Sequence, residues 1–166
     1  MKILAYNKRA NFDYDISDTF EAGVMLLGHE VKSVKTGHVS LKGSFVTSKK
    51  THKLLPEFYL TNAHIPLYKH AGSQPSYEPT RPRKLLLHKN EIARLIGKKQ
   101  EQGLTLVPIK IYTKRSLIKL EFGIGKGRKK FDKREVIKKR ETDRQLRTLT
   151  KRHSLKIKNL PRRQAG

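Results

Sequence analysis

The sequence predicts a mainly β fold with short helices and a basic C-terminal tail. Several short runs alternate apolar and polar residues, which is the period of a half-buried strand. Only two segments have the spacing of an amphipathic helix. The last part of the chain, residues 126–166, is too charged and too poor in apolar residues to build a core.

The clearest strands are predicted near the end of the folded part. Residues Leu117–Ile124 alternate from Ile118 onward, and Leu104–Tyr112 is apolar and β-branched. Residues Thr113–Ser116 would join the two as a hairpin. Pro108 cannot donate to a strand ladder, so the first of these strands is predicted to be an edge strand or to contain a bulge.

A second hairpin is predicted from Ser44–Ser48 and Phe58–Ile65, with the polar run Lys49–Lys53 between them. Residues Tyr14–Leu27 hold one or two further strands. The aromatic residues of the strands are expected to pack in the core: Phe45, Phe58, Tyr59, Tyr112 and Phe122.

Two helices are predicted between these strands. One covers Glu30–Lys35 and ends at Gly37, and the other covers Lys89–Gln102 and ends at Gly103. Many short strands with few helices in about 125 residues favour a small, closed or nearly closed antiparallel barrel. We therefore predict an OB-like antiparallel β-barrel.

Charge divides the chain into two regions. The 166 residues include 38 Lys and Arg against 14 Asp and Glu, a formal net charge of +24. Residues 1–125 carry +11 of this and residues 126–166 carry +13. We predict a barrel over 1–125 and a basic tail over 126–166 that is disordered alone, with a polyanion as the partner.

The tail has a local signal for helix. Asp132 and Glu135 have the spacing of a capping box. A helix here would be polar on nearly all sides, so it would need a partner to hold it. The two alternatives are a helix that forms on an anionic partner and a solvated basic tail that adds only nonspecific affinity.

Catalysis and membrane insertion find little support in the sequence. Cysteine is absent, which excludes disulfides and thiol chemistry. No apolar run approaches the roughly 18 residues of a membrane span, so we expect a cytoplasmic protein. The histidines lack metal-ligand spacing, and no nucleophile motif appears. We expect no catalytic residue, no metal and no cofactor.

The glycine-rich run Gly123–Gly127 lacks the spacing of a phosphate-binding loop. We expect a flexible exit from the last strand there, with contact to RNA left open.

Basic and aromatic residues occur together in three places. They interleave around Tyr6–Tyr14, a basic stretch is held extended by proline at Arg81–Lys84, and Lys126–Phe131 ends in an aromatic ring. Cationic groups bind phosphates, and rings stack on unpaired bases. No DNA-recognition helix is evident, so single-stranded or structured RNA is favoured over duplex DNA. Core packing is the alternative role for every aromatic ring, and we set it aside only for Phe12 and Phe131.

Six motifs, taken in order, resemble the SsrA-binding protein family, also called small protein B (SmpB). The resemblance covers about Tyr6 to Arg147. The motifs are Asn7–Ala10, Phe20–Gly23, Gly28–Ser33, Arg81–His88, Gly103–Pro108 and Asp132–Arg134.

This resemblance implies a non-enzymatic RNA-binding factor of trans-translation. Such a factor binds the tRNA-like part of transfer-messenger RNA and escorts it to ribosomes stalled on broken messages. The implied partners are that RNA and the ribosome, at the small-subunit decoding centre and messenger channel. No membrane partner is implied, and we expect a monomer when the protein is free.

The resemblance also assigns residues to each partner. It places Asn7, Arg9, Glu21, His88 and Lys119 at the RNA, and the basic clusters add Lys8, Arg83, Lys84, Lys126 and Arg128. Glu21 would accept a hydrogen bond from a base amino group or orient a nearby basic residue; otherwise it is a solvated carboxylate.

The resemblance places Phe131, Asp132, Lys133 and Arg134 at the decoding centre. A tail helix in the messenger channel would present Lys138, Lys139, Arg140, Arg144 and Arg147. Phe12 stands where members of the family often carry a histidine that reaches the decoding centre. Two other functions remain as alternatives: a ribosomal protein that holds rRNA permanently, and a metal-dependent nuclease.

Overall fold

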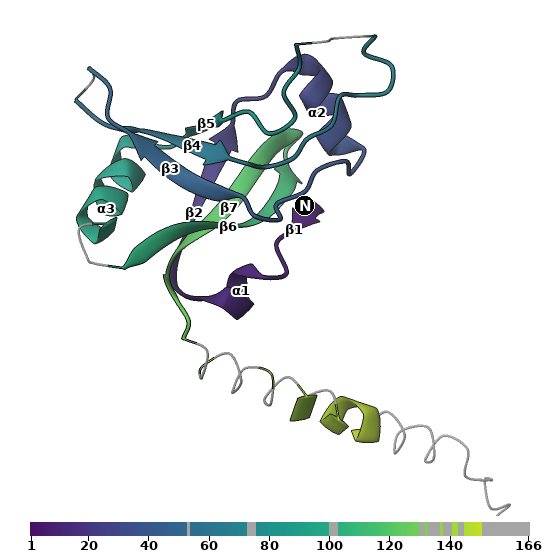
Figure 1. The fold of residues 1–166 in the computed structure, drawn as a ribbon, viewed down its shortest axis with the longest axis vertical. Coiled ribbons are helices and arrows are strands. Elements are labelled where there is room, and N and C mark those ends of the chain that lie inside the picture. The colour runs from purple at the N-terminus through teal and green to yellow at the C-terminus, as the bar shows by residue number, and fades with distance from the viewer. Residues whose placement is uncertain are drawn as a thin grey trace, which may run out of the picture. The chain divides into compact units, whose positions relative to one another are not determined.

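The computed structural model describes residues 1–52, 54–72, 76–99, 103–129, 132, 137, 141–142 and 145–150. The chain forms two compact units, Met1–Gly127 and Arg128–Gly166. The border lies two residues beyond the predicted one because the last strand continues to Gly127. Within its described residues, the first unit has seven strands and three helices (Figure 1).

The elements follow one another in this order: β1 (Lys2–Tyr6), α1 (Ala10–Asp13), β2 (Tyr14–Val24), α2 (Gly28–Lys35), β3 (Phe45–Lys49), β4 (Glu57–Thr61), β5 (Arg83–Leu86), α3 (Lys89–Lys99), β6 (Leu104–Lys114) and β7 (Leu117–Gly127).

All seven strands join one antiparallel sheet in the order β1-β6-β7-β2-β5-β4-β3. The sheet curves so that β3 lies close to β6 without being paired to it. Helices α2 and α3 lie at opposite ends of the curved sheet (Figure 1). The predicted fold class, mainly antiparallel β with short helices, is confirmed.

The core fills the inside of the curved sheet. Phe20 of β2 and Phe122 of β7 stack there with ring centroids 5.8 Å apart. Helices α2 and α3 each contribute a fully buried side chain to this core, Val34 from α2 and Leu95 from α3. The prediction that Phe45 packs in the core is wrong, since it is 41% exposed. It precedes the inward-facing Val46, so strand alternation turns its ring outward.

The hairpin of β6 and β7 is confirmed, and so is a bulge at Pro108. The register of the two strands shifts between Pro108 and Lys110. Because β6 lies between β1 and β7, the proline is not on an edge strand. Arg115 and Ser116 form the turn with φ of 48° and 66°, the left-handed conformation that tight hairpins use at both central positions.

The glycines of β7 correct another prediction. Gly123 and Gly125 are buried within the strand rather than forming a flexible exit. A Cβ at Gly123 would lie 2.5 Å from Ile16 Cγ2, and one at Gly125 would lie 2.9 Å from the Asp15 carbonyl oxygen. These glycines therefore allow β2 to approach β7 closely, and they are not available to a phosphate.

Element ends differ from prediction by a few residues. The strand predicted over Phe58–Ile65 ends at Thr61, because Asn62 adopts a φ of 59°. Helix α2 begins two residues earlier than predicted and stops before Gly37, whose φ is 88°. Sequence periodicity missed β1 and α1. The first of these is recognisable only through its pairing with the distant strand β6.

In the second unit, residues 141–142 and 145–150 are helical and exposed. This agrees with a helix that is polar on nearly all sides. Asp132 accepts a hydrogen bond from the Lys129 backbone N–H at 3.0 Å, while Glu135 of the predicted capping box lies outside the described residues. No helix in the described parts of the chain is long and apolar enough to span a membrane.

Candidate nucleic-acid interface

The outer face of β2, β6 and β7 carries a cluster of charged side chains. Strand alternation buries Phe20 and Ala22 and turns Glu21 between them to this face. Lys119 of β7 lies opposite Tyr112 of β6 in the ladder. Glu21 accepts hydrogen bonds from Lys119 Nζ and from the Tyr112 hydroxyl, and Lys114 Nζ lies 3.4 Å from both of its carboxylate oxygens. We call these four residues the Glu21 cluster.

The cluster holds Glu21 ionised. The hydrogen bond from Lys119, followed by that from Tyr112, lowers the pKa of Glu21 to about 2, against the opposing effect of burial. Burial and the adjacent carboxylate together raise the pKa of Tyr112, so its hydroxyl keeps its proton. At neutral pH the carboxylate therefore has two permanent donors. Glu21 is therefore placed to orient the ammonium groups of Lys119 and Lys114.

A second ion pair adjoins this cluster. Lys110 of β6 pairs with Glu121 of β7 at 2.9 Å and lies over the Tyr112 ring, 5.7 Å from its centroid. The face thus presents three lysines and two carboxylates. Each ammonium has three donors, and the carboxylates leave some of them available. The face can therefore offer N–H donors to phosphate or base acceptors. The carboxylates hold these donors in fixed positions.

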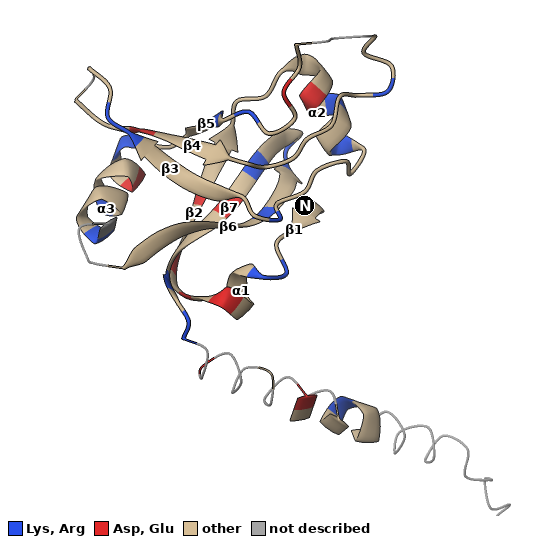
Figure 2. Cartoon of the chain, viewed as in Figure 1, with Lys and Arg blue, Asp and Glu red and all other residues tan. Residues whose placement is uncertain are grey.

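The N-terminal basic segment is positioned by Asn7. Its backbone N–H donates to the Ile109 carbonyl at 2.7 Å, and its Nδ2 donates to the Pro108 carbonyl at 2.9 Å. Its side-chain oxygen accepts from the Arg9 N–H at 3.2 Å. These bonds leave Lys8 and Arg9 exposed at a fixed turn before α1. Lys and Arg residues occur here and across the sheet and helices (Figure 2).

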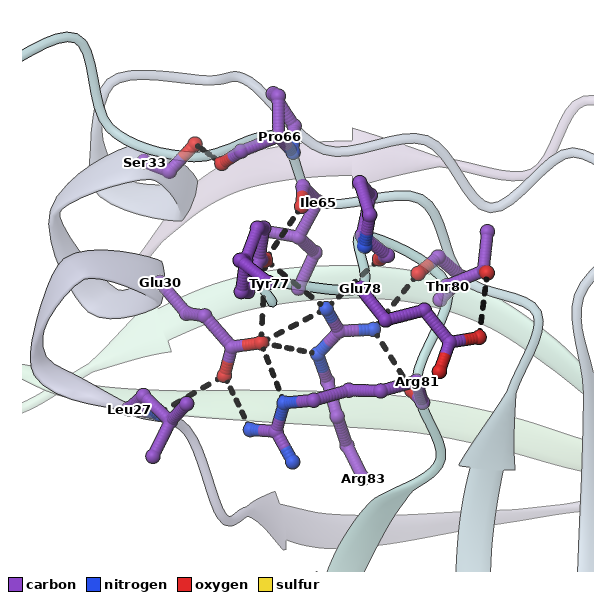
Figure 3. A network of polar contacts seen from close by, with 12 residues as sticks. Leu27, Glu30, Ser33, Ile65, Pro66, Tyr77, Glu78, Thr80, Arg81 and Arg83 are labelled. Atoms are coloured by element: carbon purple, nitrogen blue, oxygen red, sulfur yellow. Dashed lines mark hydrogen bonds and ion pairs between the residues drawn. The ribbon is translucent and has the colours of Figure 1, made fainter. Parts of the chain in front are cut away.

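A different acid–base network holds α2 to the start of β5 and to the segment before it (Figure 3). Glu30 and Arg83 are both fully buried, with Arg83 Nη2 2.8 Å from Glu30 Oε1. Arg81 forms a second ion pair with Glu30 at 2.5 Å, and the Leu27 N–H donates to the same carboxylate at 2.9 Å. The Tyr77 hydroxyl donates to the Ile65 carbonyl at 2.6 Å. We call this the Glu30 network.

The Glu30 network corrects the prediction for Arg83. Besides Glu30, its guanidinium donates to the carbonyls of Ala63 at 2.7 Å and Pro79 at 2.9 Å. A fully buried guanidinium with these partners cannot contact RNA, so Arg83 is a structural residue. Its neighbour Lys84 is partly exposed and pairs with Glu57 at 2.6 Å, which raises the pKa of the lysine.

The other predicted RNA-binding residues lie at element ends. His88 is exposed before α3, and its backbone N–H donates to the Glu91 carboxylate at 2.9 Å. Lys126 is exposed at the end of β7, where it lies opposite Asp15 of β2. Arg128 is half-buried at the start of the second unit.

The residues predicted to meet the ribosome are only partly described. Phe12 is half-buried on α1, Asp132 is half-buried, and Arg147 is exposed in a helical segment. The following predicted residues lie outside the described residues: Phe131, Lys133, Arg134, Lys138, Lys139, Arg140 and Arg144.

Two members of the Glu21 cluster were missing from the predicted site. Tyr112 is predicted to pack in the core, and it is buried, but its hydroxyl reaches Glu21. Lys114 was assigned to the turn after the strand, whereas β6 extends to include it. Continuing the alternation Lys110, Tyr112, Lys114 along one face of the strand would have found both residues.

Among the described residues, no group of three histidine or carboxylate side chains is placed to hold a metal ion.

A curved antiparallel sheet with fixed lysines on one face defines a class of basic β protein suited to binding a polyanion. The chain belongs to the SmpB family: the family model described as "SmpB protein" matches residues 4–152.

Named relatives agree with this assignment. The SsrA-binding protein of Thermosipho melanesiensis is 50% identical over 152 residues, covering 91% of this chain and 99% of the relative. That of Anoxybacillus flavithermus is 48% identical over 145 residues, covering 87% and 90%. A solved structure described as "tmRNA-SmpB: a journey to the center of the bacterial ribosome" matches with a TM-score of 0.59 and 45% identity, covering 76% of this chain and 85% of that one.

Proposed function

We propose that this protein binds transfer-messenger RNA, also called SsrA RNA, and delivers it to stalled ribosomes for trans-translation. The observation that carries the proposal is the family match over residues 4–152. The relatives' name, SsrA-binding protein, supports the RNA, and the solved complex of tmRNA with SmpB supports the ribosome as the place of action.

The protein acts by binding alone, through two regions with separate tasks. The sheet face with the Glu21 cluster binds the tRNA-like part of the RNA, since the ammonium groups of the cluster are already oriented. The basic second unit enters the messenger channel, where Phe131 and Asp132–Arg134 meet the decoding centre. This division is supported by the separation of the chain into two units, each strongly basic.

Sequencing the RNA that co-purifies with the protein tests the first part. We expect transfer-messenger RNA to dominate. Recovery of rRNA fragments alone would contradict the proposal and favour a structural ribosomal protein instead.

Removing all residues after Phe131 tests the division of tasks. The truncated protein should still bind transfer-messenger RNA, because the sheet face is intact. It should not support tagging of nascent peptides on stalled ribosomes. Lys119→Ala is the matched control. This variant keeps the tail and should bind transfer-messenger RNA more weakly than the wild type. Tagging by the truncated protein would refute the role of the tail.

A further inference from the structure

A groove of about 600 Å³ lies between the N-terminal segment and the start of β3. The stretch Tyr6–Ala10 forms one wall, and the turn Leu41–Phe45 forms the other. The floor includes Leu106 and Val107 of β6, which are buried apolar residues. The volume is in the range of small-molecule sites, which are about 300–1,000 Å³.

The cations of this groove differ from those of the Glu21 cluster. Lys8, Arg9 and Lys42 are exposed, and no described residue forms an ion pair with their side chains. Asp13 contributes a single carboxylate to the lining. Three cations against one carboxylate leave an excess of positive charge, which suits a phosphate group.

Two aromatic rings are exposed at the same groove. Tyr6 of β1 is 48% exposed and Phe45 of β3 is 41% exposed. The other aromatic residues predicted to pack in the core are buried or half-buried. Exposed rings above an apolar floor form a surface on which a base can stack, since every base has a π-face.

Both walls are fixed before any ligand arrives. Gly43 has a φ of 70°, and its carbonyl accepts a hydrogen bond from Asn62 Nδ2 at 3.0 Å. The Ser44 hydroxyl closes the turn by donating to the Leu41 carbonyl at 2.7 Å. Asn7 holds the opposite wall through its bonds to β6. A fixed site loses less conformational entropy on binding than a mobile one.

We propose that this groove binds one unpaired nucleotide of RNA. The base stacks on Phe45 over the apolar floor, and its phosphate meets Lys8 and Lys42. The inference rests on the proposed function, which makes RNA the ligand, and it adds a second binding surface formed by the turn Leu41–Phe45.

Two substitutions separate the stacking from the charge contribution. Phe45→Leu removes the ring and should weaken binding about tenfold, while Phe45→Tyr, which keeps a ring, should bind like the wild type. Lys42→Ala should reduce the slope of log affinity against log salt by about 1. Lys35→Ala, an exposed lysine of α2 outside the groove, is the matched control and should leave affinity and slope nearly unchanged.

The measurements use the full chain with purified transfer-messenger RNA in one arm and purified ribosomes in the other. An effect confined to one arm supports the groove and identifies the source of the nucleotide. Normal wild-type binding with no effect of Phe45→Leu or Lys42→Ala in either arm would overturn the groove and leave the proposed function standing. Failure of the wild type to bind either RNA would overturn both.

Discussion

The Glu30 network and the Glu21 cluster have the same ion-pair chemistry in different surroundings. In the first, Glu30 and Arg83 are fully buried, and the remaining guanidinium donors are taken by backbone carbonyls. In the second, the side chains of Glu21 and Lys119 are 31% and 28% exposed, and Lys114 is 55% exposed. The first joins α2 to the start of β5, and the second orients ammonium groups at the surface.

This comparison shows that burial decides what a charged pair does. A buried pair that loses one partner leaves an uncompensated charge in a low-dielectric interior, so it is essential to the fold. A partly exposed pair is screened by water and contributes little to stability. A partly exposed pair can instead hold the charged lysine side chain in one orientation, ready to contact a ligand.

The largest effect is expected where the buried pair is broken. Glu30→Gln should lower the free energy of unfolding by about 3–5 kcal/mol, because Arg83 keeps its charge without a partner. Urea unfolding followed by circular dichroism measures this. The double variant Glu30→Leu with Arg83→Met removes both charges and should recover part of the loss. A change under about 1 kcal/mol in Glu30→Gln would contradict the buried-pair assignment.

The second effect concerns RNA binding by the partly exposed pair. Glu21→Gln makes the protein more positive, so a purely electrostatic surface would bind RNA more tightly. If Glu21 instead orients Lys119 and Lys114, affinity for transfer-messenger RNA should fall about tenfold, the loss expected for a charged hydrogen bond. Fluorescence anisotropy at a fixed salt concentration distinguishes a gain of affinity from a loss. Tighter binding by the variant would disprove the orienting role.

The third effect is the pH dependence of stability. The pKa of Glu21 is about 2 in the folded protein, below its usual value of 4.5. Its stabilising contribution is therefore full above about pH 4.5 and is lost as the pH falls toward 2. Wild type should exceed Glu21→Gln in stability by on the order of 1 kcal/mol at pH 7, after allowance for solvent screening. Denaturant unfolding from pH 7 to 2 should show this difference vanish; a constant difference would contradict the assignment.

The smallest effect is expected at the most exposed member of the Glu21 cluster. Lys114→Ala removes a contact of 3.4 Å and should change the free energy of unfolding by less than about 0.5 kcal/mol. Affinity for transfer-messenger RNA should fall only about twofold. Lys119→Ala, measured in parallel, should have the larger effect on affinity. Equal effects would show that the two lysines act as general charge rather than through position.

Patterns along the chain are sufficient to predict the mainly β fold class, the β6–β7 hairpin, helices α2 and α3, and the concentration of positive charge in residues 126–166. These features depend on local periodicity, on glycine at helix ends and on composition, all of which can be read along the chain. The six ordered motifs also indicated the family, because their order and spacing are conditions that unrelated chains do not meet together.

Sequence patterns do not show which charged residues are available to a ligand, because that depends on tertiary packing. Arg83 and Lys84 are adjacent in the sequence, yet one is buried against Glu30 and the other is partly exposed beside Glu57. Gly123 and Gly125 became part of a close strand pairing rather than a loop. In each case the deciding partner lies far away in the chain, and local sequence patterns carry no information about such distant contacts.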